Sequence, residues 1–426
     1  MILVACGIYD VWLSLCMYPG RSCHRRLFEI FGSAYDVYSA DSAAVEAAGL
    51  PAGVASRIND KSLDRAVAIM DYCTRAGVAI VTEGCAGYPK RLVDIADPPY
   101  LLYIRGRMPD IDSCVSVSVV GTRSMSEYGK RTAYKISYEL SAAGVVIVSG
   151  MALGIDSVAA CAALDAGGTT VAVLGCGVDM AYPSQHKRLM DHIVANGAVV
   201  SEFPPGTRPD GRNFPIRNRI ISGMGLGTLV VEADTHSGAL ITARTATVQG
   251  RDIFAVPGNV GESSSGGTNE LIRGGANVVL SARDVIGVYE FPWRNSMDMT
   301  ALAAAERISD YTGGLYERYG VCAGEPKPAS KAGGENARTQ GLRITYARDK
   351  RQSDAAAHAA PARDASAELD GDLRTVYDAM KPGEKVPIDR LMRLGLTMGA
   401  LMSALTQLEI RGLVGSVPGG LYTRKK

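Results

Sequence analysis

The sequence lacks long apolar runs, paired cysteines and an excess of charge of either sign. No uncharged apolar run reaches the roughly 18 residues that a membrane span needs, so no membrane association is expected. The nine cysteines are scattered without a C-x-x-C pair, and neither they nor the five histidines show ligand spacing. These absences exclude a disulfide scaffold and predict a cytoplasmic protein with reduced thiols and no bound metal.

Charge is almost balanced over the 426 residues, with 45 basic and 44 acidic side chains. A protein of this composition does not hold a polyanion through its overall charge, so any phosphate or nucleic-acid site must be a local patch. The length is too great for one compact core and predicts two or three domains.

The common nucleotide and hydrolase motifs are missing. The first strand of the central region runs into GTRSMSEYG, which does not fit the G-x-G-x-x-G pattern of dinucleotide sites. Gly129-Lys130 is followed by Arg131 rather than Ser or Thr, so there is no P-loop, and no G-x-S-x-G elbow occurs. We therefore expect no cofactor and find no catalytic signature.

Short Val- and Ile-rich runs alternate with helical stretches through the middle of the chain. Such continuous apolar runs are typical of strands buried on both faces, and the alternation predicts a doubly wound parallel α/β sheet. The Val- and Ile-rich runs are 115–120, 145–148, 170–175, 198–202, 228–233, 252–258 and 277–281. An extended piece at 99–105 precedes the first of these runs.

The sequence pattern divides the chain into four segments. Residues 1–110 are mainly helical in pattern, and 111–288 are expected to form the core with the doubly wound sheet. Residues 289–367, rich in Ala, Gly, Pro and charge, are expected to be a partly disordered linker. Residues 368–426 predict three short helices and a β-hairpin, which favours a winged helix, although a helical tail used only for packing is the alternative.

Ligands of open parallel sheets bind beyond the carboxyl ends of the strands, where the strand order switches. Gly121-Thr122-Arg123 follows the first strand of the core and Ser149-Gly150 the second, and such small residues let backbone N–H groups approach a ligand closely. Asp156 follows at a helix start, where a structural role is equally open.

Two arginines flank an asparagine in the segment Phe214–Ser222, at the start of an apolar helix. The helix dipole disfavours Arg217 and Arg219 at that end, so they need a partner. The partner is either a bound anion or an internal carboxylate such as Glu232. Phosphate contact by Arg with base stacking on Phe214 is the usual chemistry of single-strand binding.

The basic residues of the core gather at predicted strand ends. Residues 113–287 hold 14 basic and 14 acidic side chains, so a basic rim on this neutral domain is the expected footprint of a focal polyanion site. The rim residues are Arg123, Lys187, Arg188, Arg208, Arg212, Arg217 and Arg219.

Eight segments together resemble, in order, the DNA-processing protein DprA (Smf) family. They are VVGTRSMSEYG, VSGMALGID, VLGCGVDMAYP, SEFPPG, FPIRNRIISG, VVEADTHSGALITA, GRDIFAVPG and GGTNELIRGGA. The resemblance implies an extended Rossmann core with an N-terminal SAM-like or helix-hairpin-helix-like domain and a C-terminal winged helix.

In function, the resemblance implies a homodimer that binds and protects incoming single-stranded DNA without catalysis. It also implies that the protein helps load the RecA recombinase in natural transformation. The residues expected to contact DNA are Gly121, Arg123, Ser149, Gly150, Lys187, Phe214, Arg217, Asn218 and Arg219.

An alternative function is that of a lysine-decarboxylase-like nucleotide phosphoribohydrolase, which uses a similar sheet. That class carries a P-G-G-x-G-T-x-x-E loop, which Gly267-Thr268-Asn269-Glu270 imitates only in part.

Overall fold

The computed structural model describes residues 6–20, 23–307, 315–321 and part of the C-terminal region. In that region it describes 371–391, 413–417 and 421–424, with single positions at 394, 396, 401, 404, 405 and 408. The chain divides into two compact units, 1–332 and 333–426.

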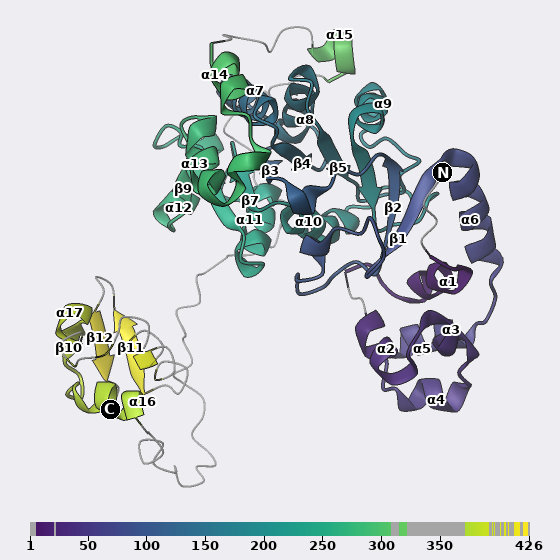
Figure 1. The fold of residues 1–426 in the computed structure, drawn as a ribbon, viewed down its shortest axis with the longest axis horizontal. Helices are drawn as coiled ribbons and strands as arrows, with labels where there is room; N and C mark the ends of the chain where they lie inside the picture. Colours follow the sequence, from purple (N-terminus) through teal and green to yellow (C-terminus); the bar gives the residue numbers. More distant parts are fainter. Residues whose placement is uncertain are drawn as a thin grey trace, which may run out of the picture. The chain divides into compact units, whose positions relative to one another are not determined.

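A nine-stranded sheet forms the centre of the first unit, in the order β1-β2-β6-β5-β4-β3-β7-β8-β9 (Figure 1). From β6 to β9 all neighbouring strands are parallel, which confirms the doubly wound α/β prediction. Each predicted run holds one strand. They are β3 (Ser116–Val120), β4 (Val146–Ser149), β5 (Thr170–Val173), β6 (Ala198–Ser201), β7 (Gly227–Val230), β8 (Asp252–Ala255) and β9 (Asn277–Val278).

Two strands from before residue 110 extend this sheet. β2 (Leu101–Gly106) pairs antiparallel with β6, with Tyr103 opposite Ser201, and β1 (Val78–Thr82) pairs antiparallel with β2. The extended piece expected at 99–105 is therefore β2. The sheet thus extends past the predicted boundary at 110, because the apolar side chains of both strands join the same cores.

Helices cover both faces of the sheet, and a separate apolar core fills each face. The first core packs α7 (Glu127–Ala142), α8 (Ile155–Asp165), α9 (Lys187–Asn196) and α13 (Ala282–Trp293) on the sheet. The second packs α10 (Asn213–Met224) and α11 (Gly238–Val248), which lie opposite α7 and α8 in Figure 1. α12 (Gly266–Arg273) lies near β8.

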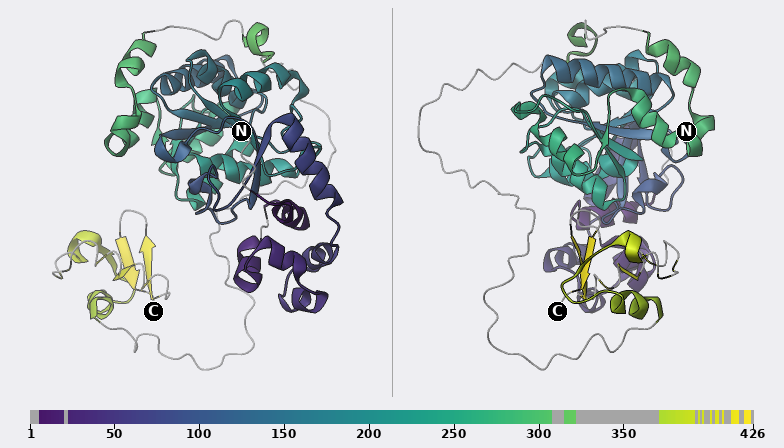
Figure 2. Two further views of the ribbon diagram at one scale, coloured as in Figure 1. Left: turned by 45° about the vertical axis from the view of Figure 1, so that its right-hand side comes forward. Right: turned by 90° about the vertical axis from the view of Figure 1, so that its left-hand side faces the viewer.

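The N-terminal helices gather at the β1 edge of the sheet, where both views of Figure 2 show them in purple. They confirm the helical pattern, while the SAM-like comparison stays a prediction. Trp12 and Leu13 of the first helix are buried in the same core as α7 and α8. The helices are α1 (Ile8–Cys16), α2 (His24–Phe31), α3 (Ala34–Ser39), α4 (Ser42–Ala47), α5 (Ala52–Asn59) and α6 (Asp64–Ala76).

The predicted linker begins with packed structure. α14 (Met299–Ala305) and α15 (Leu315–Tyr319) each bury apolar side chains in the first core, among them Leu302 and Tyr319. The disorder expected farther along, at 322–367, lies outside the described residues.

Single-turn 3-10 helices occur at η1 (Lys90–Leu92), η2 (Ile111–Ser113), η3 (Ser184–His186), η4 (Ser263–Ser265) and η5 (Arg294–Ser296).

The second unit has a core of its own and a three-stranded antiparallel sheet in the order β10-β12-β11. Val376, Leu391 and Leu405 are among its buried residues, and 404, 405 and 408 are helical. The hairpin predicted near the end is β11 with β12. The elements are α16 (Gly371–Asp378), β10 (Lys385–Pro387), α17 (Ile388–Leu391), β11 (Val414–Val417) and β12 (Leu421–Arg424).

Candidate functional site

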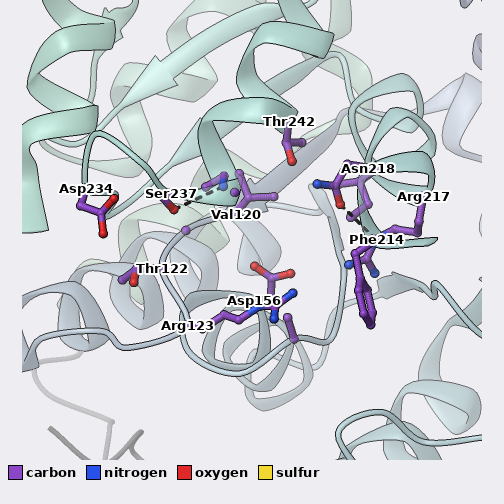
Figure 3. Close-up of a pocket in the computed structure, with 15 residues that line it drawn as sticks. Val120, Thr122, Arg123, Asp156, Phe214, Arg217, Asn218, Asp234, Ser237 and Thr242 are labelled. Carbon is purple, nitrogen blue, oxygen red and sulfur yellow. Dashed lines mark hydrogen bonds between the residues drawn. The ribbon is translucent and has the colours of Figure 1, made fainter. Parts of the chain in front are cut away.

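A pocket of about 330 Å³ lies where the strand order switches. The chain runs outward from β3 to β6 and then returns to β7 on the other side of β3, so the β3–β7 boundary is the switch point. Segments after β3, β4 and β7 line the pocket together with the first turns of α10. Figure 3 shows their side chains around one common space.

Backbone hydrogen bonds hold the lining loops together. Thr122 donates its N–H to the carbonyl of Glu232 at 2.7 Å, and Ile155 donates to the carbonyl of Thr122 at 3.2 Å. The loops after β3, β4 and β7 are thereby connected. Two helices, α8 and α11, begin at this pocket, and their N-terminal ends favour an anion.

Arg217 forms a buried wall of the pocket, with 4% of its surface exposed. Its Nη1 donates to the carbonyls of Gly150, at 2.9 Å, and Val173, and its Nε donates to Oδ1 of Asn218 at 3.1 Å. Burial lowers the pKa of Arg217 to about 10. The side chain is therefore a fixed positive group behind the pocket surface rather than a mobile one.

Gly150 is required for this arrangement of Arg217. A Cβ on Gly150 would lie 2.6 Å from both terminal guanidinium nitrogens of Arg217. The Gly150 N–H is given to Oδ2 of Asp156 at 3.0 Å. Gly150 thus orients both charged groups of the pocket, but its backbone N–H is already used and is not free for a ligand.

Asp156 places a buried carboxylate beside these arginines. Burial raises its pKa, and the nearby charges of Arg217 and Arg123 oppose that shift. In Figure 3 the carboxylate points into the pocket space. The Asp156 carboxylate therefore places an acidic group beside Arg217 and Arg123, and the pocket is not a purely cationic surface.

An exposed arginine and the ring of Phe214 line the pocket together, and a second aromatic ring outside the lining stacks on Phe214. The Arg123 guanidinium lies 5.4 Å from the ring centroid of Phe214, and the Tyr182 ring stacks on Phe214 at 5.3 Å between centroids. Sequence reasoning brought Arg123 and Phe214 together but missed Tyr182. An aromatic residue in the loop after β5, in the AYP stretch, was the available signal.

Arg219 is not part of the pocket. Its Nη2 lies 2.7 Å from Oε1 of Glu202 and its Nε lies 3.6 Å from Asp97, and the side chain is mostly buried. Arg219 therefore has an internal carboxylate partner, as one of the two expected alternatives stated, but that partner is Glu202 and not Glu232. Glu232 instead accepts the N–H of Ser126 at 2.9 Å.

Of the other residues expected to contact DNA, one lines the pocket, one is buried in a supporting position and one lies on the surface outside the pocket. Gly121 lines the pocket, with Ile155 packed against the space that a side chain would need. Ser149 is buried and donates its hydroxyl to the carbonyl of Val119 at 2.7 Å, which makes it a support for the loop. Lys187 is exposed, pairs with Asp191 at 2.5 Å and does not line the pocket.

The wider basic rim is partly neutralised. Arg212 pairs with Asp210 at 2.7 Å, and Arg188 donates to the carbonyl of Glu317 at 3.4 Å. Arg123 is exposed, lines the pocket and forms no ion pair with a described residue. Of the rim residues, Arg123 and Arg217 are the ones that bring positive charge to the pocket, while Arg208 is also exposed but does not line it.

The segment that imitates the phosphoribohydrolase loop makes internal contacts. The Asn269 side chain bonds both the N–H and the carbonyl of Gly258, and the Thr268 hydroxyl bonds the carbonyl of Ser265. Glu270 faces Arg273 at 3.7 Å. None of these residues lines the pocket.

The described residues contain no group of three or more His, Cys, Asp or Glu side chains placed to hold a metal ion. Nor do they contain a helix with the length and apolar character needed to cross a membrane.

Comparison with known proteins gives consistent matches over most of the chain. Residues 79–290 match the family described as DNA recombination-mediator protein A, and residues 360–420 match the DprA winged helix domain. The latter match, with the helices and hairpin of the second unit, confirms the winged-helix prediction.

Individual relatives agree with these matches. Protein Smf of Synechocystis sp. is 34% identical over 342 residues, which cover 79% of this chain and 78% of that protein. DNA processing protein DprA of Streptococcus pneumoniae is 44% identical over 204 residues, which cover 48% and 72%. The X-ray structure of DprA from that organism aligns with a TM-score of 0.57 at 33% identity, covering 66% of this chain and 98% of that one.

Proposed function

The chain belongs to the DprA (Smf) family of DNA recombination-mediator proteins, and on that premise we propose that it binds single-stranded DNA at the switch-point pocket. The observation that supports this site is the position of Arg123 above Phe214, which itself stacks on Tyr182. A cation and an aromatic ring that line one pocket, with a second ring stacked on the first, are the groups that a strand needs for its phosphates and its bases.

Each group has a separate task in this proposal. Arg123, which is exposed, contacts a phosphate directly, and the N-terminal ends of α8 and α11 add partial positive charge. Arg217 adds a fixed charge from behind the wall, held by Asn218 and by the carbonyl of Gly150. The aromatic pair accepts a base on its exposed face, which every base can use.

The proposed function requires no catalytic step. The hydrolase alternative places its carboxylate in the Gly267–Glu270 segment, whose side chains contact the Gly258 loop and Arg273 instead of the pocket. A nucleotide-release assay with the purified chain tests this directly. Turnover that Glu270→Ala abolishes would favour the enzyme and contradict the binding role.

Arg123→Ala tests the DNA site. We expect it to weaken oligo-dT binding and to reduce the slope of log affinity against log salt by roughly 0.7, the value for one phosphate contact on a single strand. Lys187→Ala removes an exposed charge outside the pocket, one that pairs with Asp191, and is the control, with a small expected effect. Unchanged affinity and slope in Arg123→Ala would show that the site is assigned wrongly.

The family also supports finer proposals about partners. We propose that the chain acts as a homodimer in the cytoplasm, protects incoming strands and helps load RecA during natural transformation. RecA filament formation on single-stranded DNA should be faster with the wild-type chain than with Arg123→Ala. Sedimentation equilibrium tests the dimer, and a monomer at working concentration would contradict that part.

A further inference from the structure

The pocket proposed for DNA is lined by carboxylates as well as by guanidinium groups. Its charged side chains are Arg123, Arg217, Asp156 and Asp234. A carboxylate repels a phosphate bound beside it, so a pocket that only attracted phosphate would gain nothing from either aspartate. The two acidic side chains therefore bear on which ligand the pocket prefers.

The two aspartates differ in burial and in position. Asp234 is exposed, where water and salt screen its charge, and it lies apart from Arg123 in Figure 3. Asp156 is only 6% exposed, and in the same figure its carboxylate points into the pocket space beside Arg123. Salt screens a buried charge much less. Asp156 is therefore the acidic group that a ligand held by Arg123 meets.

The surrounding chain holds Asp156 in this position as a carboxylate. It is the second residue of α8, and its Oδ2 accepts the N–H of Gly150 at 3.0 Å. The helix dipole favours a negative charge at that end of α8. Burial raises the pKa of Asp156, but the charges of Arg217 and Arg123 favour its ionised form. Asp156 thus uses positive groups that a phosphate would otherwise have to itself.

This arrangement leaves about one unit of positive charge for a ligand beside Arg123. Arg123 and Arg217 contribute two positive charges, and Asp156 contributes one negative charge. A phosphodiester inside a strand carries a single negative charge, whereas a terminal phosphate carries about 1.5 to 2 near pH 7. The available charge therefore matches the diester.

The second charge of a terminal phosphate meets the repulsion of Asp156 without a further cation to offset it. Two unit charges about 6 Å apart in a water-like dielectric repel each other by about threefold in affinity, and by more where the charge is buried. Because the repulsion scales with ligand charge, a dianion is disfavoured by about the square of this factor.

We propose that Asp156 is a specificity-determining residue, which admits the singly charged phosphodiester inside a strand and disfavours the doubly charged phosphate of a free nucleotide or a strand end. This inference rests on the proposed single-strand function and names the kind of phosphate that the pocket takes. Arg123 supplies the attraction, and Asp156 limits it to one charge.

Asp156→Asn removes the charge and keeps an oxygen for the N–H of Gly150. We expect oligo-dT affinity to rise about threefold, because the repulsion of one unit charge is removed. Asp234→Asn makes the same substitution at the exposed aspartate of the pocket and is the matched control, with a smaller expected change. Weaker oligo-dT binding by folded Asp156→Asn would mean that Asp156 only supports the pocket structure, and the proposal would be overturned.

A competition experiment on the wild-type chain covers the case in which Asp156→Asn does not fold. Labelled oligo-dT is displaced at constant ionic strength and about pH 7.5 by thymidine 5′-monophosphate or by its methyl ester, which is a singly charged diester. The methyl ester should displace the strand from the wild type at the lower concentration. In Asp156→Asn the monophosphate should gain about tenfold and the methyl ester about threefold.

The results separate this inference from the function on which it rests. A wild-type chain that prefers the monophosphate, or a variant in which both competitors gain equally, overturns the role of Asp156 and leaves the DNA site standing. If Arg123→Ala binds oligo-dT as the wild type does, the proposed function fails, and this inference fails with it.

Discussion

At the scale of single residues, one buried imidazole supports the backbone of the pocket. Met151, two residues after β4, has a φ of 53°, which is the left-handed region that a side chain rarely adopts. The fully buried His186 holds it, with Nδ1 3.0 Å from the Met151 carbonyl. Because a carbonyl only accepts, Nδ1 carries the proton of this bond; burial lowers the pKa of His186, although the bond to Met151 opposes the shift.

The lowered pKa of His186 predicts a dependence of stability on pH. Because the folded-state pKa lies below the unfolded value of about 6.5, the unfolded chain binds more protons as the pH falls through that range. The stability that the neutral His186 ring contributes is therefore present above about pH 6.5, and it is lost as the pH falls toward the folded-state pKa. His186→Asn keeps a donor for Met151 but does not titrate. Urea unfolding at about pH 7.5 and pH 5.5 should show a smaller acid loss in the variant than in the wild type, and equal losses would refute the assignment.

Sequence reasoning placed some site residues well because strand ends are readable from the chain. Gly121 and Arg123 follow a Val-rich run, and the carboxyl ends of parallel strands share one edge, so their arrival at the pocket was predictable. Tyr182 was missed because it lies in a loop before a 3-10 turn, where no periodicity indicates direction. Its place beside Phe214 depends on how that loop folds back.

At the scale of helices and strands, α10 explains why its two arginines separate. The helix begins at Asn213, so Arg217 and Arg219 lie in its second turn rather than at its first residues. Residues two apart on an α-helix point about 200° from each other. One arginine therefore faces the pocket and the other faces Glu202, and knowledge of the helix start alone would have separated them.

The buried pair of Arg219 and Glu202 should be structural. Arg219→Met leaves the Glu202 carboxylate buried without its partner, which costs about 3–5 kcal/mol of unfolding free energy. Adding Glu202→Gln removes the unpaired charge and should recover part of that loss in urea titrations. Folded Arg219→Met should still bind oligo-dT with the wild-type salt slope. A lower slope with unchanged stability would instead place Arg219 on the DNA.

The strands themselves were predictable, but part of their order was not. Continuous Val and Ile runs indicate buried strands, and all seven predicted runs hold one. The pairing of β2 with β6 joins residues almost a hundred positions apart, as in Tyr103 with Ser201. β2 pairs with β6 because β6 is an edge of the group of parallel strands, and which strand forms that edge cannot be predicted from a local sequence pattern.

At the scale of the whole chain, two units with separate cores share one polypeptide. Among the described residues, the apolar core of the second unit is made of its own side chains, with Val376 and Leu405 among them. The pocket is built entirely from residues of the first unit. Residues 367–426 hold 9 basic and 7 acidic side chains, a balance too even to mark this segment as a strong electrostatic contributor.

A chain that ends at Ala332 should therefore keep the single-strand site. Because the first unit has apolar cores of its own, its unfolding free energy should match that of the first unit in the full chain within about 0.5 kcal/mol. Its oligo-dT affinity and salt slope should also match, since Arg123, Phe214 and Tyr182 all remain. Filter binding across salt concentrations measures both, with Arg123→Ala in the short chain as the control that must weaken binding again. A slope that drops on truncation would mean that the winged-helix unit neutralises phosphates of the same strand, and the site would then extend beyond the pocket.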